Sequence, residues 1–194
     1  VTRAVKNPLV VVDMPFGTYQ GNAMEAVSNA IRIMKESQAD AVKVEGGAQV
    51  LESISKILST GIPVMGHLGL TPQSIHKFGT YAVRAKEEAE AAQLLEDAIA
   101  LERTGCFAIV LEKIPAKLAA KVSKALKIPV IGIGAGGDCD GQVLVMHDML
   151  GLNNGFSPKF LRRYANLHDE YLKAFRQYIE DVRSGDFPME NEQY

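Results

Sequence analysis

The stretch "ADAVKVEGGAQVLESISKILSTGIPVMGH", residues 39–67, contains the unit that decides the fold. Residues 41–45 form a short apolar run typical of a buried strand, residues 48–60 carry apolar side chains at helical spacing, and residues 62–67 are a second strand-like run. A strand, a helix and a second strand in this order predict two parallel strands joined by a crossover helix.

The same alternation continues outward in both directions along the chain. The six predicted strands occupy residues 8–13, 41–45, 62–67, 107–112, 128–137 and 141–148. The predicted helices occupy residues 22–37, 48–60, 71–78, 86–105, 115–126, 157–164 and 167–185. The strands are apolar at odd and even positions alike, as expected where both faces of a sheet are covered. We therefore expect one α/β domain over residues 1–194, with a parallel sheet and a flexible polar tail at 186–194.

Residue types that start or stop helices support these boundaries. Asn22 stands where it can cap the helix at 22–37, and Gly105 stands where the helix at 86–105 should end. Thr71 and Ser157 are each followed by proline, a pair typical of an N-cap and the first helical position.

Composition excludes several classes of function. The chain has 194 residues, a net charge of -2 and a pI near 6.1, and this near-neutral balance argues against nucleic-acid or acidic-membrane partners. No apolar run approaches the roughly 20 residues of a membrane span, and the first residues do not resemble a secretory signal. The cysteines, Cys106 and Cys139, lack metal-binding spacing. These features favour a reduced, cytoplasmic protein.

Polar side chains stand at the ends of most predicted strands. They are Asp13, Lys43 and Glu45, His67, Glu112, and finally His147 with Asp148. Because the carboxyl ends of parallel strands meet on one face, where α/β folds place their active sites, we expect a functional site there. For His147 and Asp148 we favour a role in shaping a loop.

Each of these residues also has a purely structural interpretation. Asp13 and Glu112 can begin turns, and His67 can be a satisfied core histidine. Lys43 and Glu45 share a strand face, because residues two apart do, and can form a structural ion pair. Burying both charges is costly without partners, and charges at several strand ends at once favour a functional site.

The glycine-rich segment Gly132–Gly137 matches G-x-G-x-x-G, the pattern of dinucleotide-binding turns. That pattern needs a helix directly after it, whereas a turn and a predicted strand follow here. We therefore reject dinucleotide binding and expect these glycines to let a substrate approach the backbone closely.

The residue types at the strand ends suggest metal-assisted chemistry on a keto acid. Two carboxylates, Asp13 and Glu45, suit Mg²⁺, which leaves positions open for substrate. Mg²⁺ polarises a keto-acid carbonyl, a nearby base can then remove the adjacent C–H proton, and Lys43 can stabilise the resulting enolate. A Schiff base on Lys43 stays open, although the adjacent carboxylate favours the unreactive ammonium form.

Longer segments resemble a known family. "DMPFGTY", "VKVEGG", "GIPVMGHLGLTPQS", "IVLEKIP" and "IPVIGIGAGGDCDGQVLVMHDMLG" occur in order and are similar to signature segments of the ketopantoate hydroxymethyltransferase (3-methyl-2-oxobutanoate hydroxymethyltransferase) family. The resemblance runs from residue 1 into the 180s. It implies a TIM-type (βα)₈ barrel, of which about six strands are present, and a homo-oligomer, usually a decamer. It also implies Mg²⁺ and transfer of a one-carbon unit from 5,10-methylenetetrahydrofolate to 3-methyl-2-oxobutanoate, giving 2-dehydropantoate.

Carried over by motif, the resemblance assigns roles to five residues. Asp13 and Glu45 become metal ligands, with Asp13 also lying at the keto acid. Lys43 binds the keto acid, and His67 lies at the substrate with a less defined role. Glu112 becomes the catalytic proton acceptor.

The resemblance also shows a departure from the family pattern. Family members begin with two more strands and carry a "GDS" segment with another metal ligand, and no "GDS" occurs here. We expect that segment to exist in the natural protein, either as a separate piece or as a further part of the same polypeptide. Two alternatives stay open, namely a related Mg²⁺–enolate enzyme of the phosphoenolpyruvate mutase or isocitrate lyase type, and a truncated non-catalytic subunit. The cysteines do not fit the loop cysteine usual in the former.

Overall fold

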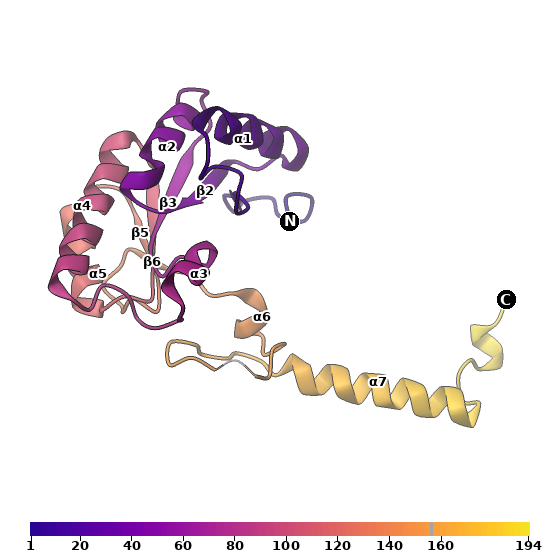
Figure 1. The fold of residues 1–194 in the computed structure, drawn as a ribbon. Helices are drawn as coiled ribbons and strands as arrows, with labels where there is room; N and C mark the ends of the chain where they lie inside the picture. Colours follow the sequence, from indigo (N-terminus) through magenta and orange to yellow (C-terminus); the bar gives the residue numbers. More distant parts are fainter. Residues whose placement is uncertain (156) are drawn as a thin grey trace. The chain divides into compact units, whose positions relative to one another are not determined.

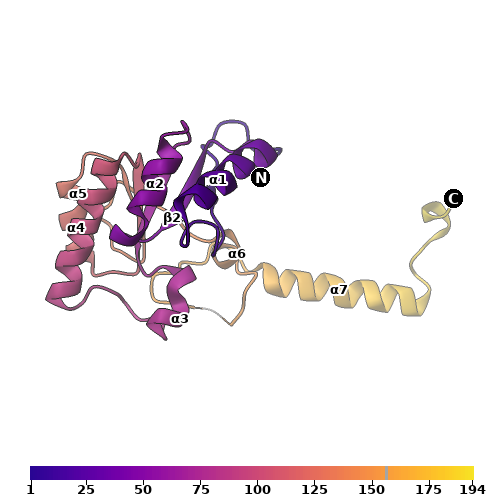
Figure 2. The ribbon, with the colours of Figure 1, turned by 45° about the horizontal axis from the view of Figure 1, so that its top comes forward.

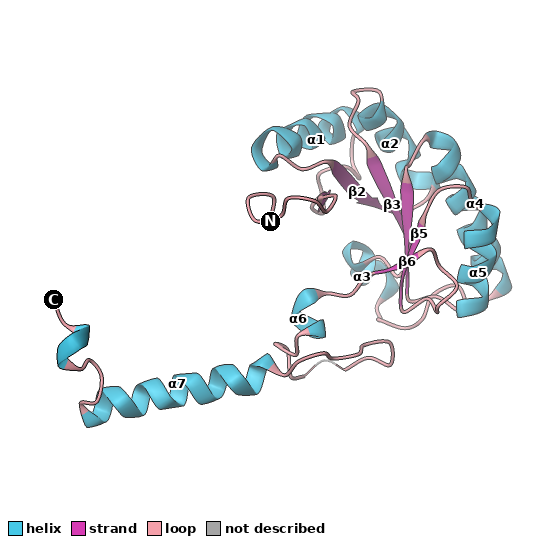
Figure 3. Cartoon of the chain, turned by 180° about the vertical axis from the view of Figure 1, so that it is seen from behind, coloured by secondary structure: helices cyan, strands magenta, loops and turns pink. Residues whose placement is uncertain are grey.

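A computed structural model describes residues 1–155 and 157–194, which form two compact units, Val1–Val143 and Leu144–Tyr194. The first unit is built on a sheet of six strands in the order β1-β2-β3-β4-β5-β6, and every neighbouring pair is parallel. The strands are β1 (Val11–Asp13), β2 (Ala41–Glu45), β3 (Val64–Gly69), β4 (Ala108–Glu112), β5 (Val130–Ile133) and β6 (Gly141–Gln142). The predicted parallel α/β sheet is confirmed, as a curled sheet that corresponds to part of a (βα) barrel (Figure 3).

Helices connect the strands and cover one face of this sheet (Figures 1 and 2). The helices of the first unit are α1 (Ala23–Ser37), η1 (Ala48–Val50), α2 (Leu51–Leu58), η2 (Pro72–Ser74), α3 (Ile75–Phe78), α4 (Glu88–Thr104) and α5 (Ala116–Ala125). Helices α1, α2, α4 and α5 pack side by side in that order. Asn22 caps α1 as predicted, because its side-chain oxygen accepts hydrogen bonds from the first backbone N–H groups, and Gly105 ends α4 in the left-handed conformation.

The hydrophobic core lies between the sheet and these helices. Alternate strand residues such as Val42, Val44 and Ile109 are fully buried against helix residues such as Ile54 and Leu101. Because successive strand residues point to opposite faces, the residues between them point to the other face of the sheet. Because their neighbours are buried in the core, the polar residues at the strand ends point to the opposite face of the sheet.

The second unit contains α6 (Met146–Met149), α7 (Leu167–Ser184) and η3 (Glu190–Glu192). Helix α7 confirms the predicted helix at 167–185, and Gly185 follows it in the left-handed conformation. Across residues 1–155 and 157–194, the structure has no helix whose length and apolar character would let it cross a membrane.

Two local predictions were wrong. The strand predicted at 141–148 ends at Gln142, and the chain instead forms helix α6 from Met146. The helix predicted at 157–164 is a loop with one turn at 159–160, since so short a segment cannot offset the cost of helix nucleation without packing. The helix predicted at 71–78 is confirmed as two consecutive helical segments, η2 and α3, with Thr71 at the N-cap position but without a side-chain cap.

Candidate active site

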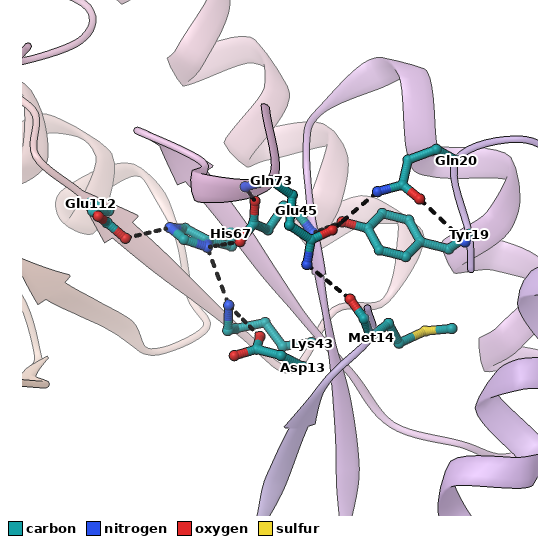
Figure 4. A network of polar contacts seen from close by, with 9 residues as sticks. All are labelled: Asp13, Met14, Tyr19, Gln20, Lys43, Glu45, His67, Gln73 and Glu112. Carbon is teal, nitrogen blue, oxygen red and sulfur yellow. Dashed lines mark hydrogen bonds and ion pairs between the residues drawn. The ribbon is translucent and has the colours of Figure 1, made fainter. Parts of the chain in front are cut away.

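The five strand-end residues singled out by the sequence form one continuous chain of polar contacts (Figure 4). Lys43 Nζ lies 2.5 Å from Asp13 Oδ1 and 3.2 Å from His67 Nδ1. His67 Nδ1 lies 3.6 Å from Glu45 Oε1, and on the other side of the ring Nε2 lies 3.3 Å from Glu112 Oε2. Four parallel strands, β1 to β4, thus contribute to a single cluster.

Strand register explains why these side chains meet. Asp13 is the register partner of Lys43, and Glu45 is the partner of His67 on the next strand. Glu112 lies opposite Gly69, two residues beyond His67 on the same face of the sheet. Pairing therefore places the charged groups on one face, at the carboxyl ends of the strands, where α/β folds bind substrates.

Burial deepens from one end of the cluster to its centre. The Asp13 side chain is 61% exposed and that of Lys43 is 15% exposed, whereas the Glu45 and His67 side chains retain 7% and 3%. Glu112 is intermediate at 19%. A solvated carboxylate thus lies at the edge of the site, and a histidine between two less accessible carboxylates lies at its centre.

Burial and neighbouring charges oppose each other at the centre. Burial alone raises the pKa of Glu45, but the His67 contact, the Gln73 backbone N–H and the nearby Lys43 outweigh it, and the pKa lies below its ordinary value. Burial lowers the pKa of His67, but the Glu112 and Glu45 carboxylates outweigh burial and the charge of Lys43, and that pKa is raised. The site favours an ionised glutamate beside a readily protonated histidine.

The two ring nitrogens of His67 have different environments. With the ring neutral and its proton on Nε2, Nδ1 can accept a hydrogen bond from the Lys43 ammonium group. With both nitrogens protonated, Nδ1–H faces Glu45 and Nε2–H faces Glu112. The Nε2 atom is buried and lacks a hydrogen bond of good geometry within the described residues. A small shift of His67 or Glu112 can therefore change how the proton between them is held.

Sequence reasoning missed a second group of residues, which surrounds Glu45. The Gln73 backbone N–H donates to Glu45 Oε2 at 2.9 Å, and the Glu45 backbone N–H donates to the Tyr19 hydroxyl oxygen at 3.1 Å. Burial is the largest cause that raises the pKa of Tyr19 to about 12. Tyr19 lies in the loop before α1 and Gln73 lies in the short helix η2, so neither is at a strand end. The available signal was the position of Gln73 in the first turn of a helix, where backbone N–H groups need acceptors.

Other predicted features have simpler roles. Within the described residues, Lys43 forms an ion pair with Asp13 and not with Glu45, so the alternative of a structural ion pair between neighbours on β2 is not supported. His147 and Asp148 belong to α6 in the second unit rather than to a strand end. A side chain at Gly136 would meet Ala116 at 2.4 Å, so this glycine lets a loop pack closely against α5.

The donor set fits a hard divalent cation only in part. The residues that the structure describes contain no group of three or more histidine, cysteine, aspartate or glutamate side chains arranged to hold a metal. Asp13 and Glu45 nevertheless provide carboxylate oxygens from adjacent strands. Mg²⁺ commonly uses one or two protein carboxylates together with water and substrate oxygens, so two such donors are compatible with it.

A pocket of about 250 Å³ lies between the segments that follow β2 and β3 and helices α3 and α4, and its lining contains none of the five cluster residues. Its lining includes Gly46, which directly follows Glu45, and Gly69, which is the register partner of Glu112. Arg84 also lines the pocket, ion-paired with Glu90 and stacked 4.1 Å above the Phe78 ring. The pocket therefore reaches the backbone next to two strand ends but is lined by no side chain of the polar cluster.

Comparisons with known proteins agree with this arrangement. Residues 1–190 match the sequence model of the family described as ketopantoate hydroxymethyltransferase. The chain is 70% identical over 194 residues to a protein of Parabacteroides distasonis, and 68% identical to one of Flavobacterium johnsoniae, both named 3-methyl-2-oxobutanoate hydroxymethyltransferase. Each comparison covers the whole of this chain and 71% of the length of the relative.

A solved structure shows the same fold at low sequence identity. The protein, described as a phosphonomutase from Burkholderia cenocepacia, is 13% identical, with a TM-score of 0.52 over 92% of this chain and 72% of that one. Fold, strand-end cluster and relatives together define a (βα)-barrel enzyme of the transferase class. Within that class, the chain belongs to the ketopantoate hydroxymethyltransferase family.

Proposed function

We propose that this enzyme transfers a hydroxymethyl group from 5,10-methylenetetrahydrofolate to 3-methyl-2-oxobutanoate, giving 2-dehydropantoate in pantothenate biosynthesis. Over the whole reaction, C3 of the keto acid loses a proton and gains the one-carbon unit, water supplies the hydroxyl oxygen, and tetrahydrofolate is released. The observation that carries the proposal is the contact chain from Asp13 through Lys43 and His67 to Glu112, in a chain 70% identical to a relative with this name.

The two carboxylates nearest the lysine are the proposed ligands of Mg²⁺. Asp13 and Glu45 would hold the ion from β1 and β2, whose ends are adjacent in the sheet. When bound, Mg²⁺ polarises the carbonyl group of a 2-oxo acid and so acidifies the neighbouring C–H bond. The exposure of Asp13 leaves its side of the site open to a substrate carboxylate.

The remaining residues handle the substrate charge and the proton. Lys43 binds the anionic keto acid and stabilises negative charge that develops on its oxygen atoms. Glu112 accepts the C3 proton, because it is a carboxylate at the inner side of the cluster with a histidine nitrogen 3.3 Å away. His67 contacts Lys43 and both glutamates and so holds the ammonium group and the base in fixed relative positions.

The direct test is product formation. Purified protein is incubated with 3-methyl-2-oxobutanoate, 5,10-methylenetetrahydrofolate and Mg²⁺, and 2-dehydropantoate is quantified by mass spectrometry. We expect the rate to fall by a factor of about 100 or more in Asp13→Asn and in Glu45→Gln, as is typical when groups that stabilise developing charge are removed. EDTA should abolish turnover in the wild-type protein.

Glu36→Gln is the matched control, because Glu36 lies on the outer helix α1, is 64% exposed and forms an ion pair with Arg32 on the same helix. This variant should retain wild-type activity. If the purified wild-type protein binds the keto acid but forms no product, the proposed activity is contradicted and a non-catalytic role is favoured. Turnover unaffected by EDTA and by both carboxylate substitutions would contradict the metal assignment alone.

A further inference from the structure

Gln73, in the short helix η2 that follows β3, joins three segments that are distant in the sequence. Its side-chain Nε2 donates to the Met14 carbonyl oxygen at 2.9 Å, and its Oε1 accepts from the Tyr19 hydroxyl at 2.7 Å. Its backbone N–H donates to Glu45 Oε2. One residue therefore contacts the turn after β1, the loop before α1 and the end of β2 (Figure 4).

The orientation of the Gln73 amide is fixed by its neighbours. Oε1 also accepts a hydrogen bond from Gln20 Nε2 at 3.1 Å, so both of its acceptor positions are used. If the amide were turned over, its NH₂ group would face the Gln20 NH₂ group, and its oxygen would face the Met14 carbonyl oxygen. The turned orientation loses the hydrogen bonds to Gln20 and Met14 and leaves the Tyr19 hydroxyl proton without its acceptor, so the observed orientation of the amide is favoured.

Tyr19 completes the ring of contacts around Glu45. Its hydroxyl donates its single proton to Gln73, and its oxygen accepts a hydrogen bond from the Glu45 backbone N–H. The Tyr19 side chain is 1% exposed and Met14 is fully buried, so water has little access to these groups. In such surroundings an unpaired polar group is costly, and the network holds its members firmly.

We propose that Gln73, supported by Tyr19, is a positioning residue that aims the Glu45 carboxylate and links it to the strand end carrying Asp13. Met14 directly follows Asp13, so the Gln73 amide holds the chain one residue from the outer carboxylate while its backbone holds the inner one. This inference rests on the proposed function in one respect, because it assigns both carboxylates to one divalent cation.

Two measurements test the positioning role, and the first needs no metal. Gln73→Met removes both ends of the amide without adding charge and with little change in length. Hydrogen exchange followed by mass spectrometry should show faster exchange in residues 14–21 and 71–78 of this variant than in the wild-type protein. Unchanged exchange in both segments would overturn the inference.

The second measurement is binding of Mn²⁺, a paramagnetic probe for a Mg²⁺ site, followed by the electron paramagnetic resonance signal of the free ion. Groups that orient metal ligands typically change metal affinity by about 10- to 100-fold when removed. We expect Gln73→Met and Tyr19→Phe to bind Mn²⁺ about tenfold more weakly, and Glu45→Gln to bind it more weakly still. Tyr19→Phe removes one hydroxyl only and serves if Gln73→Met folds poorly.

Ser53→Ala is the matched control, because the Ser53 hydroxyl donates to the Tyr19 backbone carbonyl at 2.9 Å and, within the described residues, has no hydrogen bond to Gln73 or Glu45. It removes a buried hydrogen bond to the same tyrosine and should leave Mn²⁺ affinity unchanged. An equal loss in Ser53→Ala and Tyr19→Phe indicates general loosening and contradicts the positioning role, as does wild-type affinity in Gln73→Met.

Equal Mn²⁺ binding by the wild-type protein and Glu45→Gln would instead contradict the proposed metal ligands. In that case the hydrogen-exchange comparison alone decides the positioning role of Gln73. The failure of the proposed function and the failure of this inference are therefore separate results.

Discussion

Replacing His67 by glutamine removes the titratable group at the centre of the site while keeping a polar side chain. The ring is 3% exposed and lies within 3.6 Å of carboxylate oxygens from both Glu45 and Glu112. Hydrogen bonds to charged groups contribute about 1.5–3 kcal/mol each, and leaving a buried charge without its partner costs about 3–5 kcal/mol. Because Lys43 remains nearby and Glu112 is partly solvated, we expect the lower part of this range, a loss of about 3 kcal/mol in the free energy of unfolding.

The pH dependence of this loss follows from the directions of the two pKa shifts. The pKa of folded His67 is raised above its ordinary value of 6.5, so its contribution is complete below pH 6.5 and is lost as pH rises through the folded pKa. The pKa of folded Glu45 is lowered from 4.5, so its contribution is complete above pH 4.5 and is lost as pH falls through the folded pKa. The difference between wild type and His67→Gln should therefore be largest between pH 4.5 and 6.5.

Urea unfolding followed by circular dichroism in the presence of EDTA measures this difference across the pH range. His76→Gln is the control, because His76 is an exposed histidine on α3, and we expect it to change stability by less than about 0.5 kcal/mol at every pH. The reasoning is refuted if His67→Gln also lies within 0.5 kcal/mol of wild type at pH 5.5, or if its deficit grows toward alkaline pH.

Three further predictions concern the scaffold. Gly69→Ala should lower the free energy of unfolding by about 3 kcal/mol or more in a urea titration, because Gly69 has φ +93° and the new carbon would lie 2.2 Å from the Glu112 carbonyl oxygen. Gly61→Ala is the control. Gly61 has φ +86° but lies in open space, so this substitution should cost only about 1–2 kcal/mol in the same titration. Asn22→Ala should cost about 1 kcal/mol, measured by thermal unfolding, because it removes the cap of α1. Burial raises the pKa of Cys106 from 9.0 to about 12, so the stabilising contribution of the thiol is complete below pH 9 and is lost between pH 9 and about 12. Between pH 9 and 10.5 the Cys106→Ala protein should therefore lose less stability than the wild-type protein. An equal loss in both proteins would contradict burial of the thiol as the cause.

Much of the fold could be predicted from the sequence because local and tertiary preferences agree in the first unit. Residues 41–45 are apolar at alternate positions and are followed by a helix-forming segment, and the structure has a strand with the same bounds. The prediction failed at 143–148, where an apolar run suggested a strand. Val143 and Val145 are 44% and 51% exposed, so an apolar sequence without a neighbouring strand to pair with does not extend the sheet.

The members of the site could be predicted more readily than their partners. The strand ends identified Lys43 and His67, because a charge in an otherwise buried strand stands out in the sequence. The contacts they make depend on strand register, which places Asp13 rather than Glu45 beside the lysine. Tyr19 and Gln73 were not identified, because neither the loop position of Tyr19 nor the helix-start position of Gln73 reveals which distant groups their hydrogen bonds join.

Proton removal at C3 of the keto acid is the most direct test of Glu112 as the catalytic base. The protein is incubated with 3-methyl-2-oxobutanoate and Mg²⁺ in deuterium oxide without folate, and loss of the C3 proton is followed by nuclear magnetic resonance. We expect exchange of the C3 proton in the wild-type protein and in Glu36→Gln. In Glu112→Gln we expect a rate lower by about 10²- to 10⁴-fold, because the general base is lost. Wild-type exchange in Glu112→Gln would contradict the assignment of Glu112 as the base and with it the proposed mechanism.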